Sequence, residues 1–190
     1  LDDGMVQCWG KNDDGELGNG TFARSTVPVD VIGLAGRVLR IAAASFHTCA
    51  LLETGGLQCW GASNHGQLGN GSTEPSPSAV FPLGMEAGVA YMDAGGAHTC
   101  VLMEGGPARC WGYNNEGQLG NGDYGWGNDI LEPGDVLGFP PGAMAIACGD
   151  AHTCALIEGG TLMCWGANSS SQLGDGTRTM RTTPVDVVCR

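Results

Sequence analysis

The chain has 190 residues, 34 of them glycine, and a formal charge of −12 at pH 7. Its 42% hydrophobic and 15% charged residues exclude a disordered chain, and so much glycine predicts many turns between short strands. The acidic balance disfavours direct binding to nucleic acid or an anionic membrane surface, and no apolar run is long enough to span a bilayer.

A repeat of about 51 residues organises the chain. Cys-Trp-Gly occurs four times, and the spacings between successive tryptophans are 51, 51 and 54 residues. An Asn/Gly-rich segment follows each copy, and His-Thr-Cys precedes each of the last three. The tryptophans recur once per unit, so we expect them to pack in a core: Trp9, Trp60, Trp111 and Trp165.

Each unit is predicted to hold four short strands separated by Gly, Pro and Asn. In the first full unit these strands cover residues 27–32, 38–44, 47–53 and 57–61, and the last two form a hairpin. No segment has a helical period. Four strands in about 50 residues, repeated, predict an all-β fold, a β-propeller of four-stranded blades.

The register of the repeats predicts a single repeat array over residues 1–190, without separate domains. It begins inside a hairpin and stops one strand into a further unit, so we expect three complete blades, partial units at both ends, and a longer chain of which this is a piece. The expected repeats are 1–26 (partial), 27–78, 79–134, 135–183 and 184–190 (partial).

The pattern His-Thr-x-x-Leu, then Trp-Gly, then Asn-x-x-Gly-Gln-Leu-Gly resembles the repeat of the regulator-of-chromosome-condensation family over essentially the whole chain. The resemblance implies a propeller of seven blades, about half of which lie here, with the remaining blades of the longer chain as neighbours. The cysteines stand where better-known eukaryotic members carry small residues. In this the chain is similar to an extracellular bacterial variant of the family.

Six of the nine cysteines form three pairs of equal spacing, ten residues apart. Across the predicted hairpin the two members of a pair lie opposite each other on one face, close enough for a cross-strand disulfide. Disulfides predict an oxidising compartment, hence a secreted, extracellular or cell-surface protein; the alternative is that these cysteines are small buried apolar residues. The pairs are Cys49 with Cys59, Cys100 with Cys110, and Cys154 with Cys164.

The remaining cysteines do not follow this pattern. The partner of Cys8 would precede the first residue, and Cys148 and Cys189 could pair with each other, pair with residues outside the chain, or stay free. A structural zinc site needs four ligands, whereas each unit supplies two sulfurs and one imidazole, so we expect no metal and no cofactor. The family resemblance implies a buried hydrogen-bonding role for the repeated histidine.

No nucleophile–base–acid arrangement and no phosphate-binding glycine loop is present, so we expect a protein that is not an enzyme. The longest loop between strands carries off-pattern aromatic residues, a type that anchors protein interfaces; the alternative, left open, is that they merely cover the outer edge of a blade. The candidate partner-binding residues are Tyr124, Trp126, Asn128 and Asp129, with Phe46 on another loop.

The family resemblance implies a rigid disc that presents variable loops to a protein partner. We therefore expect a disulfide-stapled binding or scaffold module, with no nucleic-acid partner and no membrane insertion. The alternative is a secreted enzyme inhibitor similar to the family's β-lactamase inhibitor. Guanine-nucleotide exchange on a small GTPase is disfavoured by the cysteines and the charge, and ultraviolet sensing by the wide separation of the tryptophans.

Overall fold

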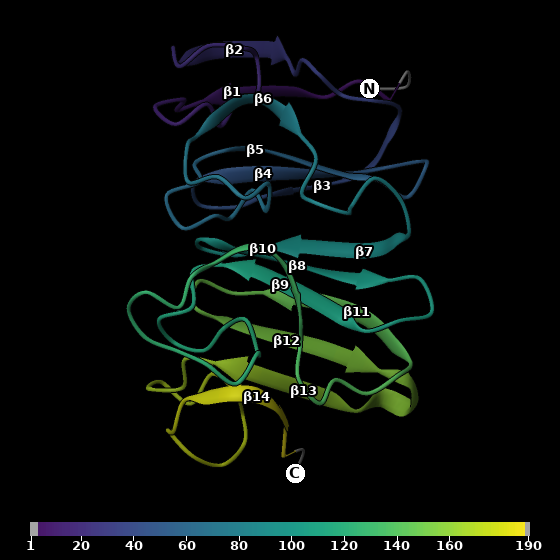
Figure 1. Ribbon diagram of the computed structural model, residues 1–190, viewed down its shortest axis with the longest axis vertical. Coiled ribbons are helices and arrows are strands. Elements are labelled where there is room, and N and C mark those ends of the chain that lie inside the picture. The colour runs from purple at the N-terminus through teal and green to yellow at the C-terminus, as the bar shows by residue number, and fades with distance from the viewer. Residues whose placement is uncertain (1–3, 189–190) are drawn as a thin grey trace.

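The computed structural model describes residues 4–188, and it is a stack of small antiparallel sheets, as the repeat predicts (Figure 1). One sheet has two strands and three have four. In chain order the strands are β1 (Gln7–Gly10), β2 (Ser25–Asp30), β3 (Val38–Ala43), β4 (His47–Leu52), β5 (Leu57–Gly61), β6 (Ser76–Val80), β7 (Val89–Ala94), β8 (His98–Met103), β9 (Ala108–Gly112), β10 (Ile130–Asp135), β11 (Ala143–Cys148), β12 (His152–Ile157), β13 (Leu162–Gly166) and β14 (Arg181–Asp186).

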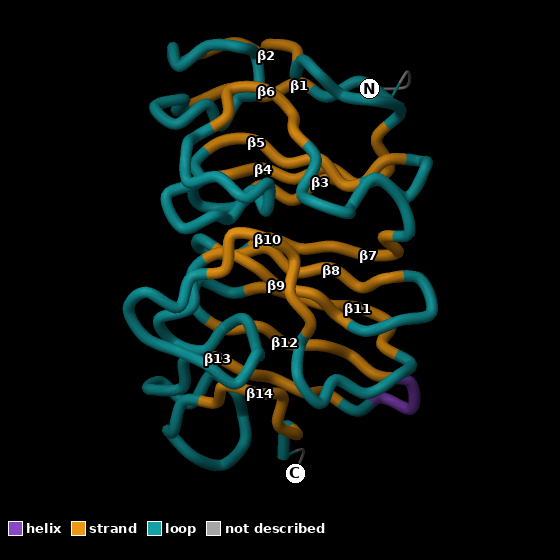
Figure 2. Tube along the Cα trace, in the orientation of Figure 1, coloured by secondary structure: helices purple, strands orange, loops and turns teal. Residues whose placement is uncertain are grey.

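The sheets are successive blades in which neighbouring strands follow each other in the chain. We call β3–β6 blade 1, β7–β10 blade 2, β11–β14 blade 3, and β1–β2 the N-terminal sheet. The one helical element in the described residues is a 3₁₀ turn of three residues, η1 (Glu158–Gly160), drawn purple in Figure 2. None of the described residues forms a helix with the length and apolarity needed to cross a membrane.

The sheets and the predicted repeats are offset by one strand. Strand 27–32 was expected to open the first full blade, but its counterpart β2 pairs with β1, where Val29 lies opposite Cys8. Likewise the last strand, β14, completes blade 3 and does not start a further unit. The repeat gives the period of the chain but not its hydrogen-bond partners. The loop after each Cys-Trp-Gly folds the next strand back beside it.

Composition matches position within each blade. Strands β4 and β5 are buried at every residue because neighbouring sheets cover both of their faces, and most of their residues are apolar. The last strand of each sheet lies at a sheet edge and carries a proline, which lacks a donor for a further strand. These residues are Pro28, Pro77, Pro133 and Pro184.

The core lies between the blades. Trp60, Trp111 and Trp165 are 0% exposed, which confirms their expected place. Trp9 was expected to be equivalent, but it is 64% exposed, because no described sheet precedes β1. The Asn/Gly-rich segment that precedes each blade fits closely against the buried tryptophan of that blade. A Cβ on Gly69, whose φ is +68°, would lie 2.6 Å from Nε1 of Trp111.

Candidate binding face and contacts between blades

Four long loops lie along the same edge of the stack, on the left in Figure 2. They connect the last two strands of each sheet in chain order, and we call this side the long-loop edge. Three short turns lie on this edge too, because each directly precedes a strand whose first residue pairs with the last residue of a Cys-Trp-Gly strand. These turns are 44–46, 95–97 and 149–151. The long loops comprise residues 11–24, 62–75, 113–129 and 167–180.

Trp126 lies in loop 113–129, and its side chain is 88% exposed, against 56% for Tyr124. The loop is ordered beneath it by its own hydrogen bonds. The amide of Gly125 donates to the carbonyl of Asn114 at 3.2 Å, and Asn128 Nδ2 donates to the carbonyl of Tyr124 at 2.7 Å. A fixed backbone therefore presents the two aromatic rings.

Asp129 ties this loop to the preceding blade. One carboxylate oxygen accepts the Asn114 amide at 3.2 Å, and the other lies 2.8 Å from Nδ1 of His65 in blade 1. The His65 ring in turn contacts the Tyr113 ring, with 4.5 Å between centroids. Asn128 and Asp129 thus hold the loop in place, while Tyr124 and Trp126 project from it.

Sequence reasoning missed His65, although it had a signal there. Its equivalents in the other repeats are Asp14, Glu116 and Ser170, so a histidine is out of pattern. Phe46 lies on turn 44–46 of the same edge, 47% exposed, with Lys11 Nζ 5.9 Å from its ring centroid.

The long-loop edge is acidic. Its long loops and short turns together hold nine Asp and Glu residues but three Lys and Arg residues. Arg181, just beyond loop 167–180, already pairs with Asp175 at 2.7 Å. The pKa of Asp175 is lowered, chiefly by the hydrogen bond from the Thr177 hydroxyl, so it stays charged over the physiological pH range. A partner with basic groups complements this edge.

Polar contacts between blades repeat in register. The Thr153 hydroxyl of blade 3 donates to the Gln118 carbonyl of blade 2 at 2.9 Å, so its oxygen accepts from His98 Nε2, also at 2.9 Å. Trp165 Nε1 donates to the same carbonyl at 2.9 Å. One blade earlier the same roles fall to His47, Thr99, Gln67 and Trp111.

These histidines are structural, as the family resemblance implied. Burial lowers the pKa of His47 to about 4 and that of His98 to about 3, so both rings are neutral at pH 7. Each Nε2 carries the proton that it donates to threonine. Each Nδ1 is buried and has no partner within the described residues.

The three predicted disulfides are present, one in each blade. Each joins the two inner strands of its blade, and the bonded cysteines lie directly opposite each other in the strand register. The Cα–Cα distances are 4.1, 4.2 and 4.1 Å in blades 1, 2 and 3. The bonded pairs are those expected from the spacing: Cys49 with Cys59, Cys100 with Cys110, and Cys154 with Cys164.

Two of the cysteines outside these pairs lie in the described part of the chain, and neither belongs to a four-ligand metal group there. Cys8 and Cys148 are free thiols, and Cys189 lies outside the described residues. The one group of metal-ligand type in the described chain is His98, Cys100 and Cys148, with ligand atoms within 4.8 Å. The disulfide occupies the Cys100 sulfur, so two ligands are left, short of a structural zinc site.

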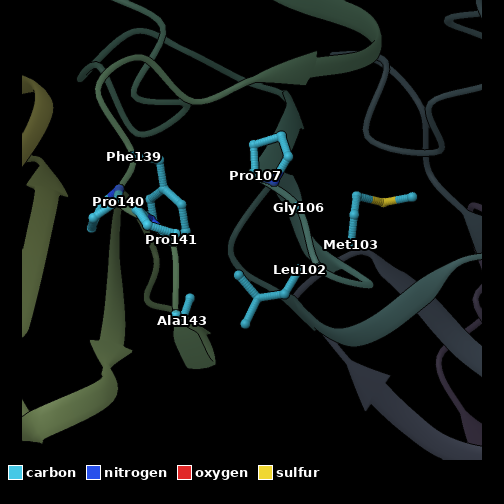
Figure 3. A pocket seen from close by; sticks show the side chains of 10 residues that line it. Leu102, Met103, Gly106, Pro107, Phe139, Pro140, Pro141 and Ala143 are labelled. Atoms are coloured by element: carbon cyan, nitrogen blue, oxygen red, sulfur yellow. The ribbon is translucent and has the colours of Figure 1, made fainter.

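A cavity of about 400 Å³ opens on the side opposite the long-loop edge, between blades 2 and 3 (Figure 3). Leu102, Met103 and Pro107 line one wall, and Phe139, Pro140 and Pro141 line the other. Its lining residues have no ionisable side chain. The cavity can accept an apolar group, and it has no group for acid, base or nucleophilic chemistry.

Comparison with known proteins shows which family these repeats match. The family model described as "Regulator of chromosome condensation (RCC1) repeat" matches residues 3–51, 54–102 and 110–156, and a second model of the same description matches 38–67, 89–118 and 145–172. The Ultraviolet-B receptor UVR8 of Arabidopsis thaliana is 34% identical over 189 residues, which is 97% of this chain and 42% of the receptor.

Two solved structures show the same fold. Human WBSCR16 superposes with a TM-score of 0.84 at 26% identity, over 100% of this chain and 50% of that one. Yeast RCC1 (Prp20), solved bound to Kap60, gives 0.82 at 23% identity, over 97% of this chain and 46% of that one. The chain thus spans half or less of the length of these proteins.

Proposed function

The chain belongs to the regulator of chromosome condensation (RCC1) repeat family, and we propose that it is a non-enzymatic binding or scaffold module that holds a protein partner on its long-loop edge. The observation that carries the proposal is the 88% exposure of Trp126 on a loop fixed by its own hydrogen bonds. An aromatic side chain on an ordered backbone binds with less loss of conformational entropy than one on a mobile loop, so such residues anchor interfaces. The structurally similar yeast RCC1 (Prp20) was crystallised in complex with another protein, Kap60.

The partner that fits this edge is a protein with a pocket for an indole and basic residues around it. Trp126 and Tyr124 supply the apolar contact, while the excess of nine acidic over three basic residues supplies the surrounding charge. Charge complementarity of this kind speeds association and selects partners more than it adds affinity. An enzyme whose active site admits Trp126 is the alternative partner, and the module would then act as an inhibitor.

An extracellular or cell-surface location follows from the same proposal. Three disulfides, one in each blade, suit an oxidising environment, because thiols in the cytosol are kept reduced. The further repeats of a longer chain are the proposed neighbours of the N-terminal sheet. They would cover Trp9, whose three equivalents are fully buried.

The test is capture of partners from the native environment with three proteins: the wild type, Trp126→Ala, and Met144→Ala as control. Met144 is 59% exposed near the start of β11, at the end of the strand away from turn 149–151, so the control removes an exposed apolar side chain away from the proposed face. We expect Trp126→Ala to lose the captured protein and Met144→Ala to retain it. Equal capture by all three proteins contradicts the assignment of this face. Inhibition of a captured enzyme favours the inhibitor alternative.

A further inference from the structure

Cys148 is a free thiol that lies beside a disulfide of the neighbouring blade. It ends β11 in blade 3, and its Sγ lies within 4.8 Å of the Sγ of Cys100 in β8 of blade 2. Cys100 is bonded to Cys110 of β9. The main-chain amide of Cys148 donates to Asp93 Oδ2 of β7 at 2.8 Å, which fixes the end of β11 against blade 2.

We propose that Cys148 and the Cys100–Cys110 disulfide form a thiol–disulfide exchange pair, which moves a cross-link from within blade 2 to between blades 2 and 3. The Cys148 thiol loses its proton to solvent, and the thiolate attacks Sγ of Cys100. The S–S bond to Cys110 breaks as the new bond to Cys148 forms. The Cys110 sulfur leaves with the electron pair and takes up a proton. One disulfide and one thiol remain, so the step needs no external oxidant or reductant.

Cys148 lies at the border between solvent on the long-loop edge and the packed interface of blades 2 and 3. Cys148 is partly exposed and lines an open cavity of about 420 Å³ together with Gly95, Gly96 and Asp150. Burial of its sulfur and, second, the Asp93 carboxylate raise the pKa of the thiol well above its usual value. The other ionisable groups around it are Asp150 on the turn, the neutral His98 of β8, and His152 of β12, whose ring lies against Gly149. The thiolate is therefore scarce at neutral pH, and exchange should accelerate as pH rises.

The juxtaposition is particular to one blade interface. Cys148 stands opposite Thr153 in its sheet, and the same register position is Ala43 in blade 1 and Ala94 in blade 2. Exchange changes what the cross-link joins: Cys100–Cys110 spans ten residues inside a hairpin, whereas Cys100–Cys148 spans 48 residues and ties two blades together. The exchanged form is therefore a covalently locked blade pair.

The experiment uses the full chain with Cys8→Ser and Cys189→Ser, which leaves Cys148 as the one thiol of the oxidised protein. The folded protein is incubated at pH 7 and pH 9, quenched with acid, alkylated and digested with pepsin without reduction. Mass spectrometry then locates the alkylated cysteine and the linked peptides. We expect label to move from Cys148 to Cys110, with a linked Cys100–Cys148 peptide forming up to about 100-fold faster at pH 9 and independently of protein concentration.

Two variants of the same background complete the design. Cys148→Ala should leave Cys110 unlabelled at every pH; label on Cys110 there would mean exchange by another route and would contradict the proposal. Cys148→Ala with Ala94→Cys places a thiol at the matching position beside Cys49, and label should then reach Cys59. A native protein in which Cys148 stays the sole labelled residue after incubation at pH 9 overturns the proposal.

Discussion

Acidification should destabilise this fold through its two fully buried histidines. His47 and His98 have pKa values of about 4 and about 3 in the folded protein, whereas an unfolded histidine titrates near 6.5. Their folded pKa values are lowered, so the unfolded chain binds more protons below pH 6.5. The stability that the neutral rings contribute is complete above that pH and is lost as pH falls toward the folded pKa values.

The size of the effect follows from how far the assay pH lies below the pKa of an unfolded histidine. At pH 5 both rings are still neutral in the folded state, whereas they are protonated in the unfolded chain. Each histidine therefore lowers the free energy of unfolding by about 2 kcal/mol relative to pH 7.5, and the pair lowers it by about 4 kcal/mol. The half-buried His152, whose pKa is also lowered by burial, acts in the same direction. Asp175 titrates well below this window and does not contribute to it.

The assay is denaturant unfolding of the disulfide-intact protein at pH 5, 6 and 7.5, followed by tryptophan fluorescence. The variant His98→Asn should be less stable at every pH because it changes the contact with Thr153. Between pH 7.5 and pH 5, however, its free energy of unfolding should fall by about 2 kcal/mol less than that of the wild type. Equal losses in the two proteins would refute the assignment of His98 as a buried, neutral hydrogen-bond donor.

Three further expectations follow from the structure. Replacing both Cys49 and Cys59 with Ala removes a cross-link spanning ten residues and should lower the free energy of unfolding by about 3 kcal/mol in chemical denaturation; no change would mean that the staple is absent in solution. Gly69→Ala should cost at least about 2 kcal/mol more than Gly138→Ala, because both have φ near +67° but open space surrounds Gly138; equal melting temperatures contradict the close fit. Asp129→Asn should speed proteolytic cleavage within loop 113–129 without changing the melting temperature, and unchanged cleavage would show that this carboxylate does not order the loop.

The strands and disulfides were predictable because they depend on local spacing. The ten-residue separation of Cys49 and Cys59 sets their opposition across a hairpin, and the structure pairs those two positions, as it pairs Cys154 with Cys164 two blades later. The grouping of strands into blades was not predictable in the same way. Strand β2 follows its partner β1 after a long loop, and a repeated sequence looks the same whichever strand is counted first.

Contacts between blades were the least accessible to sequence reasoning. A buried hydrogen-bonding role for His98 was expected, but its chain of contacts ends on the Gln118 carbonyl, a backbone group without a sequence signature. The approach of Cys148 to Cys100 likewise depends on how β11 packs against β8. The exposed Trp126 was found because it breaks the repeat, and the sequence alone did not reveal the hydrogen bonds that fix its loop.

The most direct test of the proposed binding role is the footprint of the captured partner, measured by hydrogen–deuterium exchange in the complex and in the free chain. The account predicts new protection in loop 113–129 and on turn 44–46, on the long-loop edge that carries Trp126. Protection confined to the opposite side, around the cavity lined by Phe139, would contradict it.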